Sequence, residues 1–110
     1  MNTLKNKVQL IGNLGNDPEI INLESGKTLA KFSIATNDSY KNASGEKITD
    51  TQWHNIVAWG KTAEIIEKYL TKGKEIAIEG KLTTRSWEDK DGMKRYTTEV
   101  VVNELLMLGK

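Results

Sequence analysis

The chain has no cysteine, one proline and one histidine among its 110 residues. The lack of cysteine excludes disulfides and thiolate metal sites, and it permits a reducing compartment. A lone histidine, His54, leaves too few ligands for most zinc sites. No run of about 18 apolar residues is present, and the N-terminus has no cleavable apolar leader. We therefore expect a cytoplasmic protein with no membrane span, no cofactor and no metal.

Neither sign of charge dominates, because 16 Lys and Arg stand against 15 Asp and Glu, for a net charge of +1. A strongly basic balance, typical of nucleic-acid binders, is absent. A polyanionic partner would therefore require the cations to be sorted onto one face of the fold. The length predicts a single domain over residues 1–110.

Five segments alternate between apolar and polar residues with a period of two, which is typical of half-buried strands. They cover residues 7–14, 29–36, 52–59, 75–87 and 96–103. Turn-forming residues separate the segments, and the turn DKDG at residues 89–92 joins two long strands, which predicts a protruding hairpin. The fold class is therefore all-β.

One segment, KTAEIIEKYLTKGK from residue 61, has helical periodicity instead. Thr62 is a suitable N-cap, Gly73 can end the helix, and the predicted apolar face contains Ile65, Ile66, Tyr69 and Leu70. A short helix between the third and fourth of five strands is the plan of the OB-fold, a partly open barrel that binds oligonucleotides or oligosaccharides.

The tryptophans lie on the strand face opposite to the one that carries the aliphatic residues. Ile56 and Ala58 share one face of the third strand, whereas Trp53 and Trp59 share the other, and Trp87 lies on the same side of its strand as the cation Arg85. Tryptophan in a β-domain is usually buried, and a β-bulge would invert the alternation locally. Three tryptophans on the polar face nevertheless favour an exposed binding surface.

Exposed aromatic rings beside cations suit single-stranded nucleic acid, because every base has a face to stack and every linkage has a phosphate to neutralise. An oligosaccharide-binding OB module is the alternative, since it also uses exposed tryptophans. Catalysis, for example by a nuclease, would need carboxylates that converge on a metal ion. The acidic residues are instead scattered over the helix surface and the hairpin tip, so we expect no enzyme activity.

Four stretches resemble the bacterial single-stranded DNA-binding proteins of the homotetrameric OB-fold type. They are NKVQLIGNLGNDPEI, TLAKFSIATNDSYKN, TDTQWHNIVAWGKTAEIIEKYLTKGKEIAIEGKL and TRSWEDKDGMKRYTTEVVVN, and they cover nearly the whole chain in order. The resemblance implies base stacking on the aromatic residues Tyr40, Trp53, Trp59 and Trp87. It implies phosphate contacts by Lys7, Lys61, Lys72 and Arg85, with Asn13 and Lys74 as further candidates.

Some positions depart from the pattern of this family. Tyr40 and Trp59 replace the familiar Trp and Phe and keep a flat ring, whereas Asn55 and Thr83 stand where arginines are familiar. Members of the family usually continue through a flexible linker to an acidic tail that recruits other proteins. This chain stops at LLMLGK, as a truncated or a naturally short form would, so no tail-mediated partner is assigned.

The resemblance also implies a homotetramer that protects single-stranded DNA during replication, recombination and repair, in the cytoplasm and at the nucleoid. His54 lies on the same strand face as Ile56, which favours a packed, hydrogen-bonded side chain over a catalytic base. By resemblance, this position lies near the subunit interface.

Overall fold

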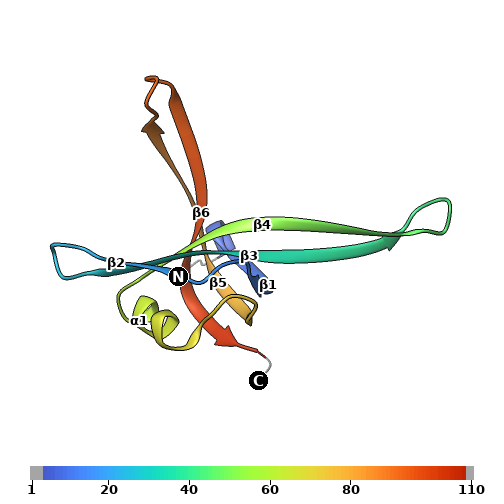
Figure 1. The fold of residues 1–110 in the computed structure, drawn as a ribbon, viewed down its shortest axis with the longest axis horizontal. Helices are drawn as coiled ribbons and strands as arrows, with labels where there is room; N and C mark the ends of the chain where they lie inside the picture. Colours follow the sequence, from blue (N-terminus) through green and yellow to red (C-terminus); the bar gives the residue numbers. More distant parts are fainter. Residues whose placement is uncertain (1–3, 109–110) are drawn as a thin grey trace.

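This computed structural model describes residues 4–108. They contain six strands, one α-helix and a short 3-10 helix, joined by turns and loops. Figure 1 shows two long hairpins that project from a central barrel, and α1 covers one end of the barrel. The elements in chain order are η1 (Leu4–Asn6), β1 (Val8–Leu14), β2 (Glu19–Asn22), β3 (Thr28–Lys41), β4 (Lys47–Trp59), α1 (Gly60–Tyr69), β5 (Glu75–Glu88) and β6 (Lys94–Met107).

Five of the strands close into a barrel in the order β1-β5-β6-β4-β3. The barrel closes where the end of β1 also pairs with β3, at Asn13↔Ala35 and Leu14↔Ile34. Gly12 lies beside this crossing, and a Cβ there would come 2.3 Å from the Ala35 carbonyl oxygen, so only glycine permits the approach. The predicted OB-fold, with its helix between the third and fourth barrel strands, is confirmed.

The barrel interior contains the apolar residues that alternate inward along the strands. The largest fully buried side chains are Ile34, Ile56, Ile66 and Ile76, of which Ile66 comes from α1. Since α1 packs mainly against β3, the helix seals one end of this core.

The predicted apolar face of the helix is partly wrong. Ile66 and Leu70 are buried as expected, together with Ala63, whereas Ile65 is 42% exposed and Tyr69 is 57% exposed. The buried residues are spaced by three and four positions, which defines a narrower stripe than the predicted one. The helix also begins earlier than predicted, at Gly60, and its N-cap is Trp59, so Thr62 is not the cap.

Two arms project from the barrel, and only one of them was predicted. The β5–β6 hairpin turns at residues 89–92 as expected, but β3 and β4 also extend past the barrel and pair out to Lys41↔Lys47. Residues 37–41 and 47–51 are nearly all exposed, so this arm has solvent on both faces and lacks the alternation on which the prediction relied. The short strand β2, which pairs with the start of β3, was likewise not predicted.

Candidate nucleic-acid interface

The outward face of β4 carries two exposed tryptophans. Trp53 is 62% exposed and Trp59 is 44% exposed, whereas Ile56 and Ala58, on the opposite face of the strand, are buried in the barrel. Six residues at about 3.3 Å each separate the two tryptophans by roughly 20 Å along the strand. The prediction that both lie outside the core is confirmed.

The ring of Trp53 lies against the backbone of Gly15. A Cβ on Gly15 would come 2.3 Å from Trp53 Cζ3, far inside contact distance, so a larger residue would displace the indole. The Gly15 N–H donates to the Ser33 carbonyl at 2.9 Å. The Ser33 hydroxyl in turn donates to Asn16 Oδ1 at 3.0 Å. The loop after β1 therefore helps to set the position of Trp53.

Between the two tryptophans lies a hollow surface that we call the central groove. It consists of two adjoining hollows of about 440 and 400 Å³, which share Lys31, Val57, Arg85 and Glu99. Trp59 lines one of the hollows, and Ser33, which neighbours Trp53, lines the other. The central groove therefore joins the two aromatic positions across the outward face of the barrel.

An ion pair forms part of the floor of the central groove. Arg85 Nε lies 3.2 Å from Glu99 Oε1, and Arg85 Nη2 donates to Glu99 Oε2 at 3.4 Å. Hydrogen bonding to Glu99, together with the attraction of its negative charge, raises the pKa of the Arg85 guanidinium above its ordinary value. Of the two side chains, Glu99 is only 9% exposed and Arg85 is 55% exposed.

Lys31 and Glu99 are residues of this groove that the sequence reasoning did not single out. Lys31 alternates with the buried residues Ala30 and Phe32, so the period of two along β3 could have identified it as an outward cation. Glu99 gives no such signal, because a buried carboxylate is identified only when its partner is known.

Trp87 lies on the β5–β6 arm, 44% exposed. Its indole Nε1–H donates to Thr97 Oγ1 at 2.9 Å, which holds the ring against β6. A register shift does occur between β5 and β6, but the extra residue is Asn103 on β6, since Glu79 pairs with Glu104 and Gly80 with Val102. The alternation along β5 is therefore not inverted, and Trp87 is outward as predicted.

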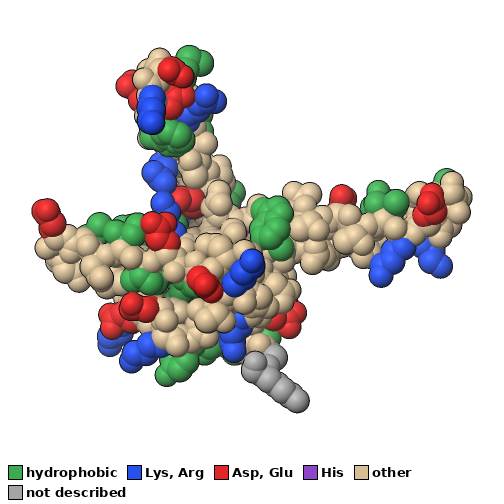
Figure 2. All heavy atoms as spheres, in the orientation of Figure 1, with side chains coloured by type: hydrophobic (Ala, Val, Ile, Leu, Met, Phe, Trp, Pro, Cys, Tyr) green, Lys and Arg blue, Asp and Glu red, His purple; other side chains and the backbone are tan. Residues whose placement is uncertain are grey.

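Tyr40 lies apart from the three tryptophans, on the β3–β4 arm, 54% exposed. It pairs with Ile48, whereas Trp53 pairs with Ala35, and alternation places these two pairs on opposite faces of the two-stranded ribbon. Figure 2 shows this arm with Lys and Arg along one side and hydrophobic and acidic side chains along the other. The structure therefore does not bring all four aromatic rings onto one face.

The other predicted phosphate contacts lie outside the central groove. Lys72 and Lys74 belong to the loop between α1 and β5, and Asn13 donates to the Gly73 carbonyl of the same loop at 3.1 Å. Lys61 lies exposed in the first turn of α1. These four residues therefore lie in and beside the helix and the loop that follows it.

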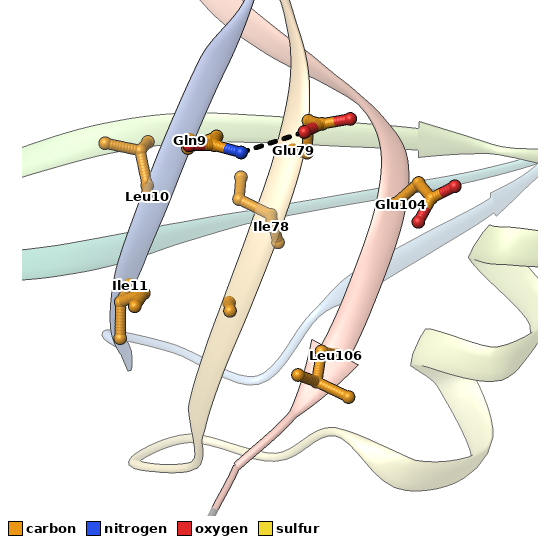
Figure 3. Close-up of a pocket in the computed structure, with 8 residues that line it drawn as sticks. Gln9, Leu10, Ile11, Ile78, Glu79, Glu104 and Leu106 are labelled. Atoms are coloured by element: carbon orange, nitrogen blue, oxygen red, sulfur yellow. Dashed lines mark hydrogen bonds between the residues drawn. The ribbon is translucent and has the colours of Figure 1, made fainter.

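Lys7 lies on another surface, formed by the outer faces of β1, β5 and β6. Its Nζ pairs with Glu79 Oε1 at 3.2 Å. The pKa of Glu79 is lowered, first by the hydrogen bond that Gln9 donates and then by Lys7. A hollow of about 590 Å³ lies on this surface. Ile11 and Leu106 lie exposed on either side of β5 (Figure 3). We call this surface the β1–β5–β6 face.

His54 makes a hydrogen bond within the barrel wall. Its Nε2 lies 3.0 Å from Thr36 Oγ1 on the neighbouring strand, and the side chain is partly buried. The expectation of a packed, hydrogen-bonded histidine is confirmed, whereas its place at a subunit interface remains a prediction.

Within residues 4–108, no cluster of three or more His, Cys, Asp or Glu side chains has the arrangement of a metal site. No helix in this part of the chain is long and apolar enough to cross a membrane.

A closed OB barrel with exposed aromatic rings beside a groove that bears cations defines a class of protein, the OB-folds that bind oligonucleotides or oligosaccharides. Comparison with known families agrees. Residues 5–108 match the model of the single-strand binding protein family, and the chain belongs to that family.

Two curated relatives are both described as single-stranded DNA-binding protein 1. The one from Chlorobaculum tepidum is 51% identical over 105 residues, which are 94% of this chain and 65% of that protein. The one from Xylella fastidiosa is 48% identical over 106 residues, which are 96% of this chain and 78% of that protein. The chain therefore spans about two thirds to four fifths of the length of these relatives.

A solved structure described as the Plasmodium falciparum SSB complex with ssDNA has the same fold. It superposes with a TM-score of 0.86 at 34% identity, and the match covers 99% of this chain and 100% of that one.

Proposed function

We propose that this protein binds single-stranded DNA with little sequence preference. The observation that carries the proposal is the pair of exposed tryptophans, Trp53 and Trp59, on either side of the central groove with its cations Lys31 and Arg85. Bases stack on the indole rings, and the lysines contact phosphates. Membership of the single-strand binding protein family supports the same ligand.

The proposed contact residues extend beyond the groove. Trp87 and Tyr40 supply further stacking surfaces on the two arms, and a strand that reaches Tyr40 passes around the edge of the β3–β4 arm. The proposed polar contacts outside the groove are Lys7, Asn13, Lys61, Lys72 and Lys74. Lys7 is the least favoured of these, because Glu79 already neutralises it.

The strength of binding argues for several linked domains. Each stacked base contributes about 1 to 3 kcal/mol, so four aromatic platforms contribute about 4 to 12 kcal/mol. Association alone costs about 4 to 15 kcal/mol. One domain therefore binds weakly, and several domains on one strand bind tightly through their combined contacts.

We propose a homotetramer as the source of these domains. Within the described residues, β1 pairs with β5 over Val8–Asn13 but with β3 only at its end, so one edge of β1 is left open. Beside this edge, the β1–β5–β6 face exposes Ile11 at 60% and Leu106 at 63%. An open strand edge and an apolar face suit pairing with another copy of the chain.

Light scattering tests the assembly. Wild-type protein is expected to have four times the mass of one chain. Ile11→Glu places a charge on the proposed contact face and is expected to give a smaller species with its fold retained. A monomeric wild-type protein would contradict the tetramer.

The proposed activity is binding without cleavage of the strand. One acidic residue of the hairpin tip is engaged in structure, because the Asp89 carboxylate accepts hydrogen bonds from Arg95 and from the backbone N–H of Met93, which lower its pKa. Cleavage of labelled single strands by the purified protein in the presence of magnesium would overturn this part of the proposal. We place the protein with the DNA it binds, in the cytoplasm and at the nucleoid, where it protects single strands during replication, recombination and repair.

The main test is a titration of tryptophan fluorescence with oligo-dT at several salt concentrations. Stacking on Trp53 and Trp59 should quench the emission, and the logarithm of affinity should fall with the logarithm of salt by about 0.7 per phosphate neutralised. A neutral oligosaccharide serves as the control ligand, because an oligosaccharide-binding OB module would bind it with little response to salt. Absence of quenching by oligo-dT, or affinity that salt leaves unchanged, would refute the proposal.

A further inference from the structure

The Arg85–Glu99 pair has an unusual place for a surface ion pair, because it lies in the floor of a groove proposed to hold a polyanion. Both carboxylate oxygens of Glu99 face the guanidinium, at 3.2 and 3.4 Å. Glu99 as a residue is only 8% exposed, and it is the one buried charged residue within residues 4–108. Its negative charge therefore depends on Arg85 for compensation.

A DNA phosphate at Arg85 would have to compete with Glu99. If the phosphate displaced the carboxylate, Glu99 would be left as a buried charge without its partner, which is strongly unfavourable. If the carboxylate stayed, the phosphate would lie beside a pair with no net charge, so it would release few counterions. Either way, Arg85 is a poor phosphate site while Glu99 is ionised.

Lys31 differs from Arg85 because its charge is not engaged in an ion pair within the described residues. It lines both hollows of the central groove, as Arg85 and Glu99 do, and it is half-buried. The ion pairs formed by residues 4–108 engage Lys7, Arg85 and Arg95, and none of them engages Lys31. Glu19, which lies opposite Lys31 in the β2–β3 register and also lines one of the hollows, forms no ion pair with it. Its charge remains available to a phosphate.

Arg85 and Glu99 still have hydrogen-bond donors and acceptors that their ion pair does not use. A guanidinium has five N–H donors and a carboxylate has about four lone-pair sites, and the pair itself uses two of each. The pair therefore presents a donor next to an acceptor, in an orientation fixed by the fork of the arginine. The Watson–Crick edge of every base likewise carries a donor next to an acceptor.

We propose that Arg85 and Glu99 act together as a neutral contact for the edge of a base, and that Lys31 is the phosphate contact of the central groove. The inference rests on the proposed binding of single-stranded DNA and specifies how the strand is oriented, with a base directed inward at the pair and the backbone toward Lys31. All four bases satisfy such a pair, so sequence preference stays low.

The salt dependence of oligo-dT binding tests this assignment through three variants. Glu99→Gln removes the negative charge and frees Arg85 for a phosphate, so the slope of log affinity against log salt should steepen by about 0.7. Lys31→Gln should make it shallower by about 0.7. The double variant Arg85→Gln with Glu99→Gln removes the pair without leaving a lone buried charge, and it should keep the wild-type slope.

Glu67→Gln is the matched control for Glu99→Gln. Glu67 is exposed on α1, so this change alters the net charge equally but lies outside the groove, and it should leave the slope unchanged. Thermal unfolding of each variant checks that the fold is retained.

A second ligand separates contact with bases from contact with the backbone. On oligo-dT the double variant should bind about tenfold more weakly than wild type, because a lost hydrogen-bonded contact is worth about 1.4 kcal/mol. On an abasic strand of the same length it should bind as well as wild type.

The inference fails if Glu99→Gln leaves the slope unchanged while the double variant lowers it by about 0.7, because Arg85 would then be a phosphate contact. It also fails if the double variant weakens binding of the abasic strand as much as binding of oligo-dT. Both results would leave the proposed function intact. Failure of wild-type protein to bind oligo-dT would instead overturn the function itself.

Discussion

Replacing Trp53 with alanine is expected to weaken the binding of single-stranded DNA by about 1 to 3 kcal/mol per domain, which is a factor of about 5 to 150. The indole is 62% exposed, so little apolar area leaves the core and the free energy of unfolding should change by less than about 1 kcal/mol. Fluorescence titration with oligo-dT and thermal unfolding, both at fixed salt, measure the two quantities.

Trp53→Phe is the matched control for this prediction. It keeps a flat ring beside Gly15, so most of the affinity should remain. Trp87→Ala should resemble Trp53→Ala, although the loss of the hydrogen bond to Thr97 adds a small cost in stability. Large destabilisation of Trp53→Ala with little loss of affinity would mean that the indole belongs to the core.

Replacing Ile66 with alanine is expected to lower the free energy of unfolding by about 2 to 5 kcal/mol. Ile66 is fully buried between α1 and the barrel, and truncation of its side chain leaves a cavity as well as removing apolar burial. Denaturant unfolding at one protein concentration measures the change, because the stability of an oligomer depends on concentration.

The neighbouring residue Ile65 is the control for Ile66. It belongs to the same helix but is 42% exposed, and alanine has the better helix propensity, so Ile65→Ala should change stability by less than about 0.5 kcal/mol. Equal losses for both variants would contradict the assignment of the buried helix stripe.

The sequence predicted the parts of the fold whose residues repeat with a fixed period. Alternation along the strands identified Ile56 and Ala58 as inward and Trp53 and Trp59 as outward, because side chains of a strand point to opposite faces in turn. The same regularity was absent from the β3–β4 arm, where polar residues face water on both sides. That arm and the position of Tyr40 on it were therefore not predicted.

The apolar face of α1 shows that helical periodicity is insufficient to predict which residues are buried. Three apolar residues of α1 and its C-cap residue Leu70 lie near one another around the helix axis. Only contact with the barrel decides that Ile66 and Leu70 are covered while Ile65 and Tyr69 are not. The width of a buried stripe depends on the surface that covers it.

The sequence by itself determined that this chain forms an OB barrel with tryptophans on its outer surface, because local alternation specifies which side chains face inward. Only the tertiary structure decided which charges meet. Glu99 pairs with Arg85 and Glu79 with Lys7 because strand register places residues side by side that lie 14 and 72 positions apart in the chain. Local periodicity carries no information about such distant partners. The charges available in the central groove, and with them the proposed path of the DNA backbone, therefore follow from strand pairing and barrel closure.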